Sequence, residues 1–164
     1  MKKLLLLFIS FSLLSCSNIR KLSDQSKIIE CPRVFFSSES NIYIDGPKDN
    51  LDIENINYKA SLNNSGFVED CISNNNFNYY NLDLLILIEL ISKEIKNINI
   101  PIFVLLYDSK GKLIDKKYFQ YRDEFIHTNQ KSEYKTIEKI INLNIAHDAY
   151  IKIDSFIIGF ARIR

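Results

Sequence analysis

The feature that most constrains the fold is a series of short runs of β-branched and aromatic residues, which recurs from residue 31 onward between polar turn residues. In 56–63, Ile56, Tyr58, Ala60 and Leu62 alternate with polar residues, which is typical of a strand with one buried face. We expect 73–78 to be a loop. Further runs predict strands at 33–38, 41–44, 134–143 and 150–162.

The clearest hairpin lies in the second half of the chain. Strands are predicted at 100–107 and 112–121, joined by Asp108-Ser109-Lys110-Gly111. Asp at the first position and Gly at the last suit a type I turn with a glycine bulge. The basic and aromatic run 116–122 alternates in polarity, so we interpret it as an amphipathic strand and not as a nucleic-acid surface.

The apolar segment 81–95 is ambiguous by itself. Leu82, Leu84, Ile86, Ile88 and Leu90 would line one face of a strand, and leucines at the intervening positions would cover the centre on its other side. Periodicity alone does not separate a strand from a helix in such a run. The strands on both sides leave an isolated helix without a role, so we favour a strand.

Together these runs predict an all-β chain with one immunoglobulin-like or fibronectin-like antiparallel β-sandwich of about seven to eight strands, at 31–164. The length of 164 residues suits one domain. The formal net charge of +1 gives no long-range field for nucleic acid, and we expect no nucleic-acid partner.

The amino terminus has the features of an export signal. Lys2 and Lys3 precede an apolar stretch from Leu4 to Leu14, which is too short to span a bilayer but fits a signal peptide.

The end of this leader resembles the bacterial lipoprotein signal, or lipobox, with Leu13, Leu14, Ser15 and Cys16 at its four positions. The resemblance implies cleavage between Ser15 and Cys16, a diacylglycerol thioether on the Cys16 sulfur, and acylation of the new amino terminus, typically with palmitate. Residues 1–15 would then be the signal peptide and 16–30 the lipidated end and a polar tether. By resemblance to the sorting rule of enterobacterial lipoproteins, Ser17 in place of Asp after the cysteine implies the outer membrane over the inner membrane, with the domain facing the periplasm. An ordinary secretory signal with an incidental Cys16 is the alternative.

Three cysteines are present. If Cys16 carries lipid, Cys31 and Cys71 remain, and export places them where disulfides form. We expect them to pair, with two free thiols as the alternative.

Several motifs are similar to an uncharacterised family of short alphaproteobacterial lipoproteins. They are "CPRV" at 31–34, a strand like "INYKA", Cys71, the hairpin "IPIFVLLYDSKGKLIDKKYF" and the closing "YIKIDSFIIGFAR". Ile102 stands where the family usually has Tyr. The resemblance covers about 31–162, supports the disulfide and the sandwich, and implies no activity. Matching positions are Pro101, Phe103, Val104, Asp108, Gly111, Lys116, Phe119, Gly159 and Phe160.

Residues with catalytic or metal-binding chemistry are few. His127 and His147 have no partner at a metal-ligand spacing. The spaced acids at 49–54 lack the glycine and the terminal Glu of a calcium loop, and we interpret the two carboxylates beside Cys71 at 69–71 as solvated. No phosphate-binding or dinucleotide-binding glycine motif occurs. We therefore expect no catalytic residue, metal or cofactor, and assign Tyr79 and Tyr80 to loop packing.

The sequence favours a non-catalytic, lipid-anchored binding or scaffolding module of the bacterial envelope, with an unidentified envelope protein as its partner. Fold analogy places binding at the loops 45–52, 64–78 and 122–132. The alternative is a carrier or sensor that holds a small hydrophobic ligand or lipid between the sheets, suggested by the apolar excess at 82–91.

Overall fold

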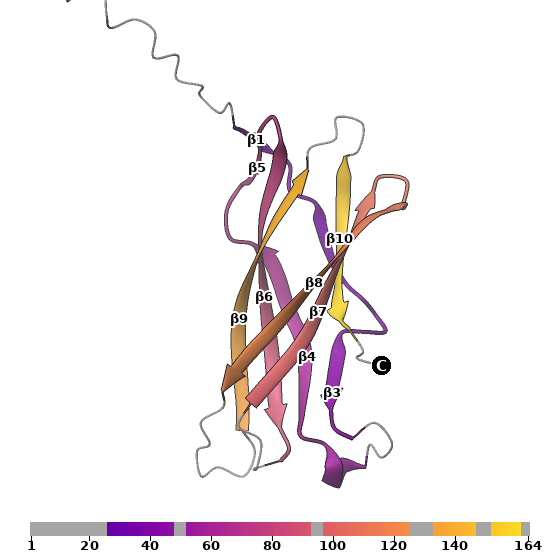
Figure 1. Cartoon of the computed structure of the whole chain (residues 1–164), viewed down its shortest axis with the longest axis vertical. Helices are drawn as coiled ribbons and strands as arrows, with labels where there is room; N and C mark the ends of the chain where they lie inside the picture. The colour runs from indigo at the N-terminus through magenta and orange to yellow at the C-terminus, as the bar shows by residue number, and fades with distance from the viewer. Residues whose placement is uncertain (1–25, 48–51, 93–96, 125–132, 147–151, 162–164) are drawn as a thin grey trace, which may run out of the picture.

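Most of the residues that the structure describes lie in β-strands (Figure 1). A computed structural model describes residues 26–47, 52–92, 97–124, 133–146 and 152–161. Within these ranges no helix could cross a membrane. The elements are β1 (Lys27–Ile29), β2 (Arg33–Phe36), β3 (Ile42–Asp45), the 3-10 helix η1 (Ile53–Asn55), β4 (Tyr58–Phe67), β5 (Cys71–Ser73), β6 (Phe77–Leu90), β7 (Asn97–Asp108), β8 (Leu113–Glu124), β9 (Glu133–Ala146) and β10 (Ile153–Phe160).

The strands form two sheets that pack face to face. The six-stranded sheet has the order β1-β5-β6-β4-β3, in which β5 and β4 pair with different parts of the same edge of β6. Strand β9 pairs with the opposite edge of β6. The four-stranded sheet has the order β2-β10-β7-β8. Alternate residues of both sheets point inward and form one apolar core. This arrangement confirms the predicted all-β sandwich, with ten strands in the described ranges where seven to eight were expected.

The connections follow the immunoglobulin-like pattern. Strands β4, β6 and β9 lie side by side as A, B and E do in that fold, while β8, β7 and β10 correspond to C′, C and F. The place of strand G, beside β10, is taken by β2, which runs parallel to β10. Every other strand pair in the described ranges is antiparallel.

The segment 81–95 forms a strand, as predicted, within β6. Strand β9 pairs with β6 along its whole length, and β4 pairs with most of the other edge. Residues Leu82, Leu84, Ile86, Ile88 and Leu90 are buried, whereas Leu85 and Leu87 are half-buried on the outer face. The centre of β6 is thus fully covered on one side only.

The predicted loop at 73–78 is wrong, because a tight turn joins β5 to β6. The Asn74 side-chain Oδ1 accepts hydrogen bonds from the backbone N–H groups of Asn76 (2.9 Å) and Phe77 (2.7 Å). Such an Asx turn lets β6 begin at Phe77. Another difference lies upstream, where β1 begins at Lys27, inside the segment expected to be a tether.

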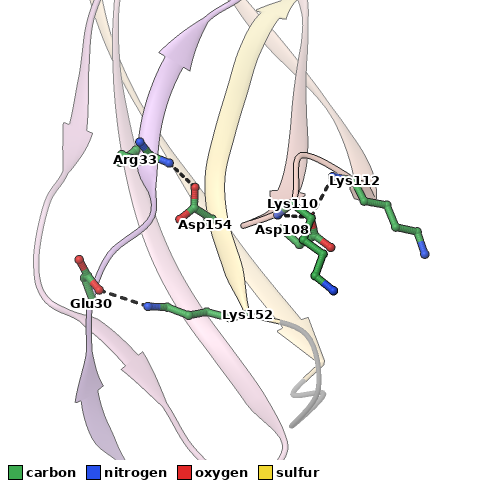
Figure 2. A network of polar contacts seen from close by, with 7 residues as sticks. All are labelled: Glu30, Arg33, Asp108, Lys110, Lys112, Lys152 and Asp154. Atoms are coloured by element: carbon green, nitrogen blue, oxygen red, sulfur yellow. Dashed lines mark hydrogen bonds and ion pairs between the residues drawn. The ribbon is translucent and has the colours of Figure 1, made fainter.

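The β7–β8 hairpin is confirmed in detail. The Gly111 N–H donates to the Asp108 carbonyl (3.0 Å), and Gly111 has a φ of 75°, as a type I turn with a glycine bulge requires. The Asp108 Oδ1 also accepts from the N–H groups of Lys110 (2.9 Å) and Lys112 (2.8 Å) (Figure 2). The register then shifts by one residue at Ile114.

Two buried contacts between the sheets fix how far one sheet is shifted along the strand direction relative to the other. Tyr80 of β6 packs edge-on against Phe156 of β10, with ring centroids 5.3 Å apart. Further along, the Tyr58 hydroxyl of β4 donates to the Asn99 carbonyl of β7 (2.9 Å) and accepts from the Asn99 N–H (3.1 Å). The sheets are therefore held together by a specific polar contact as well as by the core.

We expect Tyr58→Phe to lower the free energy of unfolding by about 1–2 kcal/mol at neutral pH, because both Asn99 backbone groups lose their partner. Burial raises the pKa of Tyr58 above that of an unfolded tyrosine, about 10. This stabilisation is fully present below about pH 10 and is lost as the pH rises further. Urea unfolding at neutral and alkaline pH measures both effects.

The wild-type protein should therefore lose stability more steeply above about pH 10 than the Tyr58→Phe variant. Tyr118→Phe, which changes an exposed tyrosine on the outer face of β8, is the matched control and should leave neutral stability within about 0.5 kcal/mol of wild type. Equal unfolding free energies for wild type and Tyr58→Phe would contradict the structural role of this hydrogen bond.

Candidate binding surface

The amino-terminal segment joins the two sheets. Strand β1 belongs to the six-stranded sheet and β2 to the four-stranded sheet, so the chain crosses between the sheets at residues 30–32. At this crossing Cys31 forms a disulfide with Cys71, the first residue of β5, with their Cα atoms 5.3 Å apart. The structure thus contains the expected pairing.

Ion pairs lie along the same segment (Figure 2). Arg33 of β2 pairs with Asp154 of β10, and Glu30 pairs with Lys152 at 3.3 Å. All four groups are partly or largely exposed, so each pair contributes little to stability. Their alternating charges favour the parallel register of β2 on β10.

We expect the double substitution Cys31→Ser with Cys71→Ser to lower the free energy of unfolding by about 4 kcal/mol, because the bond closes a loop with a sequence separation of 40. Urea unfolding of the mature protein without reductant measures this loss. Wild type in reductant should match the variant, and reductant should not change the variant. Two reactive thiols in denatured, unreduced wild-type protein would contradict the bond.

The outer face of the four-stranded sheet carries a group of apolar and aromatic side chains, which we call the aromatic face. Strand register places Phe35, Ile157, Leu105 and Lys116 in one row across the four strands, and Gly159, Phe103 and Tyr118 in the next. Phe35, Leu113 and Tyr118 are 49%, 46% and 62% exposed. The apolar members are Phe35, Pro101, Phe103, Leu105, Tyr107, Leu113, Tyr118 and Ile157.

Basic groups lie on this face. The Lys116 ammonium lies 4.8 Å from the ring centre of Tyr118 and 5.6 Å from that of Phe103, and the Arg33 guanidinium lies 5.8 Å from that of Phe35. These cation–π contacts hold the rings and the charges in one layer. The Phe103 ring lies across Gly159, where an added Cβ would stand 2.5 Å from the ring edge.

A polar cluster closes the side of the sandwich between β8 and β9. Asp123 accepts hydrogen bonds from the Lys135 ammonium and from the Tyr121 hydroxyl (2.7 Å). The Lys135 contact, and then that of Tyr121, holds the pKa of Asp123 below its ordinary value, whereas burial raises the pKa of Tyr121. We interpret this cluster as structural, because its charges satisfy one another.

A pocket of about 390 Å³ opens between the sheets near the β5–β6 turn. It has an apolar wall with polar groups on one side, and a salt bridge of 2.8 Å joins Lys117 to Asp115 there. The Asn78 Oδ1 is buried without a hydrogen-bond partner. The lining residues are Phe77, Asn78, Ile114, Asp115, Lys117, Asn144, Ile145, Ala146 and Ile153.

The predicted site residues are only partly within the described ranges. Ser15, Cys16, His127 and His147 lie outside them, as do 48–51 of the expected binding loop 45–52 and 125–132 of the expected binding loop 122–132. The expected loop 64–78 is mostly strand, in β4, β5 and β6. No group of three or more His, Cys, Asp or Glu residues could hold a metal in the ranges that the structure covers.

The prediction that Tyr79 and Tyr80 belong to a loop is wrong, because both lie in strand β6. Tyr80 is buried in the core, and the Tyr79 hydroxyl accepts from the Asn74 side-chain amide at 3.1 Å. The amphipathic strand predicted at 116–122 is confirmed, with Lys116, Tyr118, Gln120 and Arg122 exposed.

The aromatic face itself was not anticipated. Alternation within β8 exposes Tyr118, and alternation within β2 exposes Phe35, but these strands lie far apart in the sequence. Only the strand order brings their outward residues together. Comparisons with protein families, with curated proteins and with solved structures gave no match to this chain.

Proposed function

We propose that the protein is a lipid-anchored lipoprotein of the bacterial envelope and a non-catalytic binding module, whose partner docks on the aromatic face. The observation that carries the proposal is the clustering of exposed Phe35, Leu113 and Tyr118 on one sheet face. A contiguous apolar patch of this kind marks an interaction site more often than scattered surface residues do. Aromatic and arginine side chains are also the usual energetic centres of protein interfaces.

The lipobox-like end of the amino-terminal leader supports the proposed lipid anchor. Cys16 would carry the lipid, and residues 17–26 would span at most about 36 Å when extended. Strand β1 lies at the end of the sandwich that holds the β5–β6 turn (Figure 1). An anchor there would leave both outer faces open along the sides of the molecule. Ser17 favours the outer membrane for this proposal.

A second candidate function is the carriage or sensing of a small hydrophobic ligand or lipid. The pocket beside Phe77, Ile114 and Ile145 favours it, because its wall is largely apolar and Asn78 offers an unpartnered oxygen. The aromatic face remains our first choice, because the middle of the sandwich is a packed core.

We expect Cys16→Ser to remove the lipid and to release the protein from the membrane fraction, because the thioether requires the sulfur. Incorporation of labelled palmitate and detergent-phase partitioning of the full chain measure the change. The Cys31→Ser and Cys71→Ser double variant is the matched control and should keep its label. A wild-type chain without lipid, cleaved as an ordinary secreted protein, would contradict the anchor.

We expect the double substitution Phe35→Ser with Tyr118→Ser to reduce chemical cross-linking of the full-length protein to its envelope partner by about tenfold or more, because two exposed aromatic contacts are lost. Ile28→Ser with Val68→Ser, two exposed apolar residues elsewhere, is the matched control. Unchanged cross-linking in the first variant would contradict the proposed face. A co-purified lipid in native mass spectra would favour the pocket.

A further inference from the structure

The two ends of the sandwich differ in charge. One end, which we call the anchor end, contains β1, the β5–β6 turn, the β7–β8 turn and the start of β10 (Figure 1). Strand register connects these parts, because Lys27 pairs with Ser73 before the β5–β6 turn and Ile153 pairs with Asp108 before the β7–β8 turn. Phe77 and Ile153 also line one pocket, so the two sheets end side by side there. Four exposed lysines lie at this end: Lys27, Lys110, Lys112 and Lys152.

Most of this positive charge has no acidic partner. Lys152 is the exception, because it pairs with Glu30 at 3.3 Å. In the described ranges the other three lysines of the anchor end form no ion pair. Asp108 accepts the N–H groups of its own turn, and its single charge offsets only one lysine. In Figure 2 the side chains of Lys110 and Lys112 extend away from this turn, and both residues are exposed.

The opposite end carries more acids than bases among the described residues. It contains η1 and the ends of β3, β6 and β8 (Figure 1). Its bases are Lys59 and Arg122, together with Lys135, which pairs with Asp123. The molecule is therefore positive at the anchor end and negative at the other. The acids of this second end include Asp45, Asp52, Glu54, Glu89 and Glu124.

The segment before β1 brings the anchor end close to the membrane in the proposed lipoprotein. Residues 17–26 separate Cys16 from Lys27, so the domain lies at most about 36 Å from its lipid. This segment adds two bases, Arg20 and Lys21, and one acid, Asp24. Basic residues next to a membrane anchor are attracted to anionic lipids. The chain thus enters the sandwich at the end whose charge suits such a surface.

We propose that the anchor end docks on the membrane that holds the lipid, with Lys27, Lys110 and Lys112 against anionic lipid head groups and the acidic end pointing away. This inference rests on the proposed anchor and adds a second contact, which orients the domain. The acids of the opposite end oppose the reverse orientation, because an anionic surface repels them. A few exposed lysines hold too weakly to replace the lipid, so Cys16→Ser still releases the protein.

Energy transfer in vesicles tests this orientation. The lipidated full-length protein carries a donor dye on one added cysteine, either Asn75→Cys in the β5–β6 turn or Asn55→Cys in η1, and the vesicles carry an acceptor on their head groups. Both positions are exposed, and the 14 residues of β6 separate the two ends by roughly 45 Å. Changing the vesicles from phosphatidylcholine to a mixture with phosphatidylglycerol should raise the transfer from Asn75→Cys about twofold and lower that from Asn55→Cys.

Charge removal provides the second arm. Lys110→Gln with Lys112→Gln should remove most of the difference between the two kinds of vesicle, because two unpaired cations of the contact are lost. Lys59→Gln with Arg122→Gln removes the same charge from the acidic end, and this matched control should keep the difference. Salt at about 0.5 M should abolish the difference in the unmutated chain, because exposed charges are screened. Unfolding free energies close to wild type show that the variants fold.

The outcomes separate the inference from the proposed anchor. Equal transfer in neutral and anionic vesicles overturns the inference, and so does a difference that survives Lys110→Gln with Lys112→Gln. A rise for both labels means that the domain lies on its side, which also overturns it. In each of these cases the protein still associates with neutral vesicles, so the lipid anchor stands. A chain that does not associate with neutral vesicles contradicts the anchor, and with it the inference.

Discussion

The sandwich depends on the crossing of the chain from one sheet to the other at Cys31. The immunoglobulin-like order of the remaining strands leaves an edge of β10 that strand G would normally cover. Strand β2 pairs with that edge in parallel and satisfies its backbone groups. The disulfide to Cys71 holds the crossing against β5, so the segment that closes the four-stranded sheet is also fixed to the six-stranded sheet.

The same segment would receive the force of a membrane anchor in the proposed lipoprotein. A pull on the chain before Lys27 reaches β1 first and then the disulfide, because Cys31 follows β1 directly. Both sheets share this load before β2 can separate from β10. A covalent bond at this point is more useful than one in the core, where Phe156 and its neighbours already pack closely.

Local signals in the sequence predicted the elements that depend on near neighbours. Asp108 and Gly111 identified the hairpin turn, and alternation identified β4 and the exposed side of β8. Pairing between distant segments was beyond such signals. Neither the three-residue strand β1 nor the parallel pairing of β2 leaves a pattern of its own, because β1 depends on β5 and the pairing of β2 depends on β10. The aromatic face was missed for the same reason, since four strands contribute to it.

The edges of the sheets bear on how the protein can associate with a partner. Exposed strand edges invite pairing between chains, and natural sheets block this with charges, bulges and short strands. Here β8 carries a bulge at Ile114 and a lysine pair at 116 and 117, while β3 is only four residues long. The exposed apolar residues lie on the faces. Strand β9, at another edge of the six-stranded sheet, is long but carries Lys135, Glu138 and Lys139. Because the edges carry these features, contact through a face suits this molecule better than the addition of a strand at an edge.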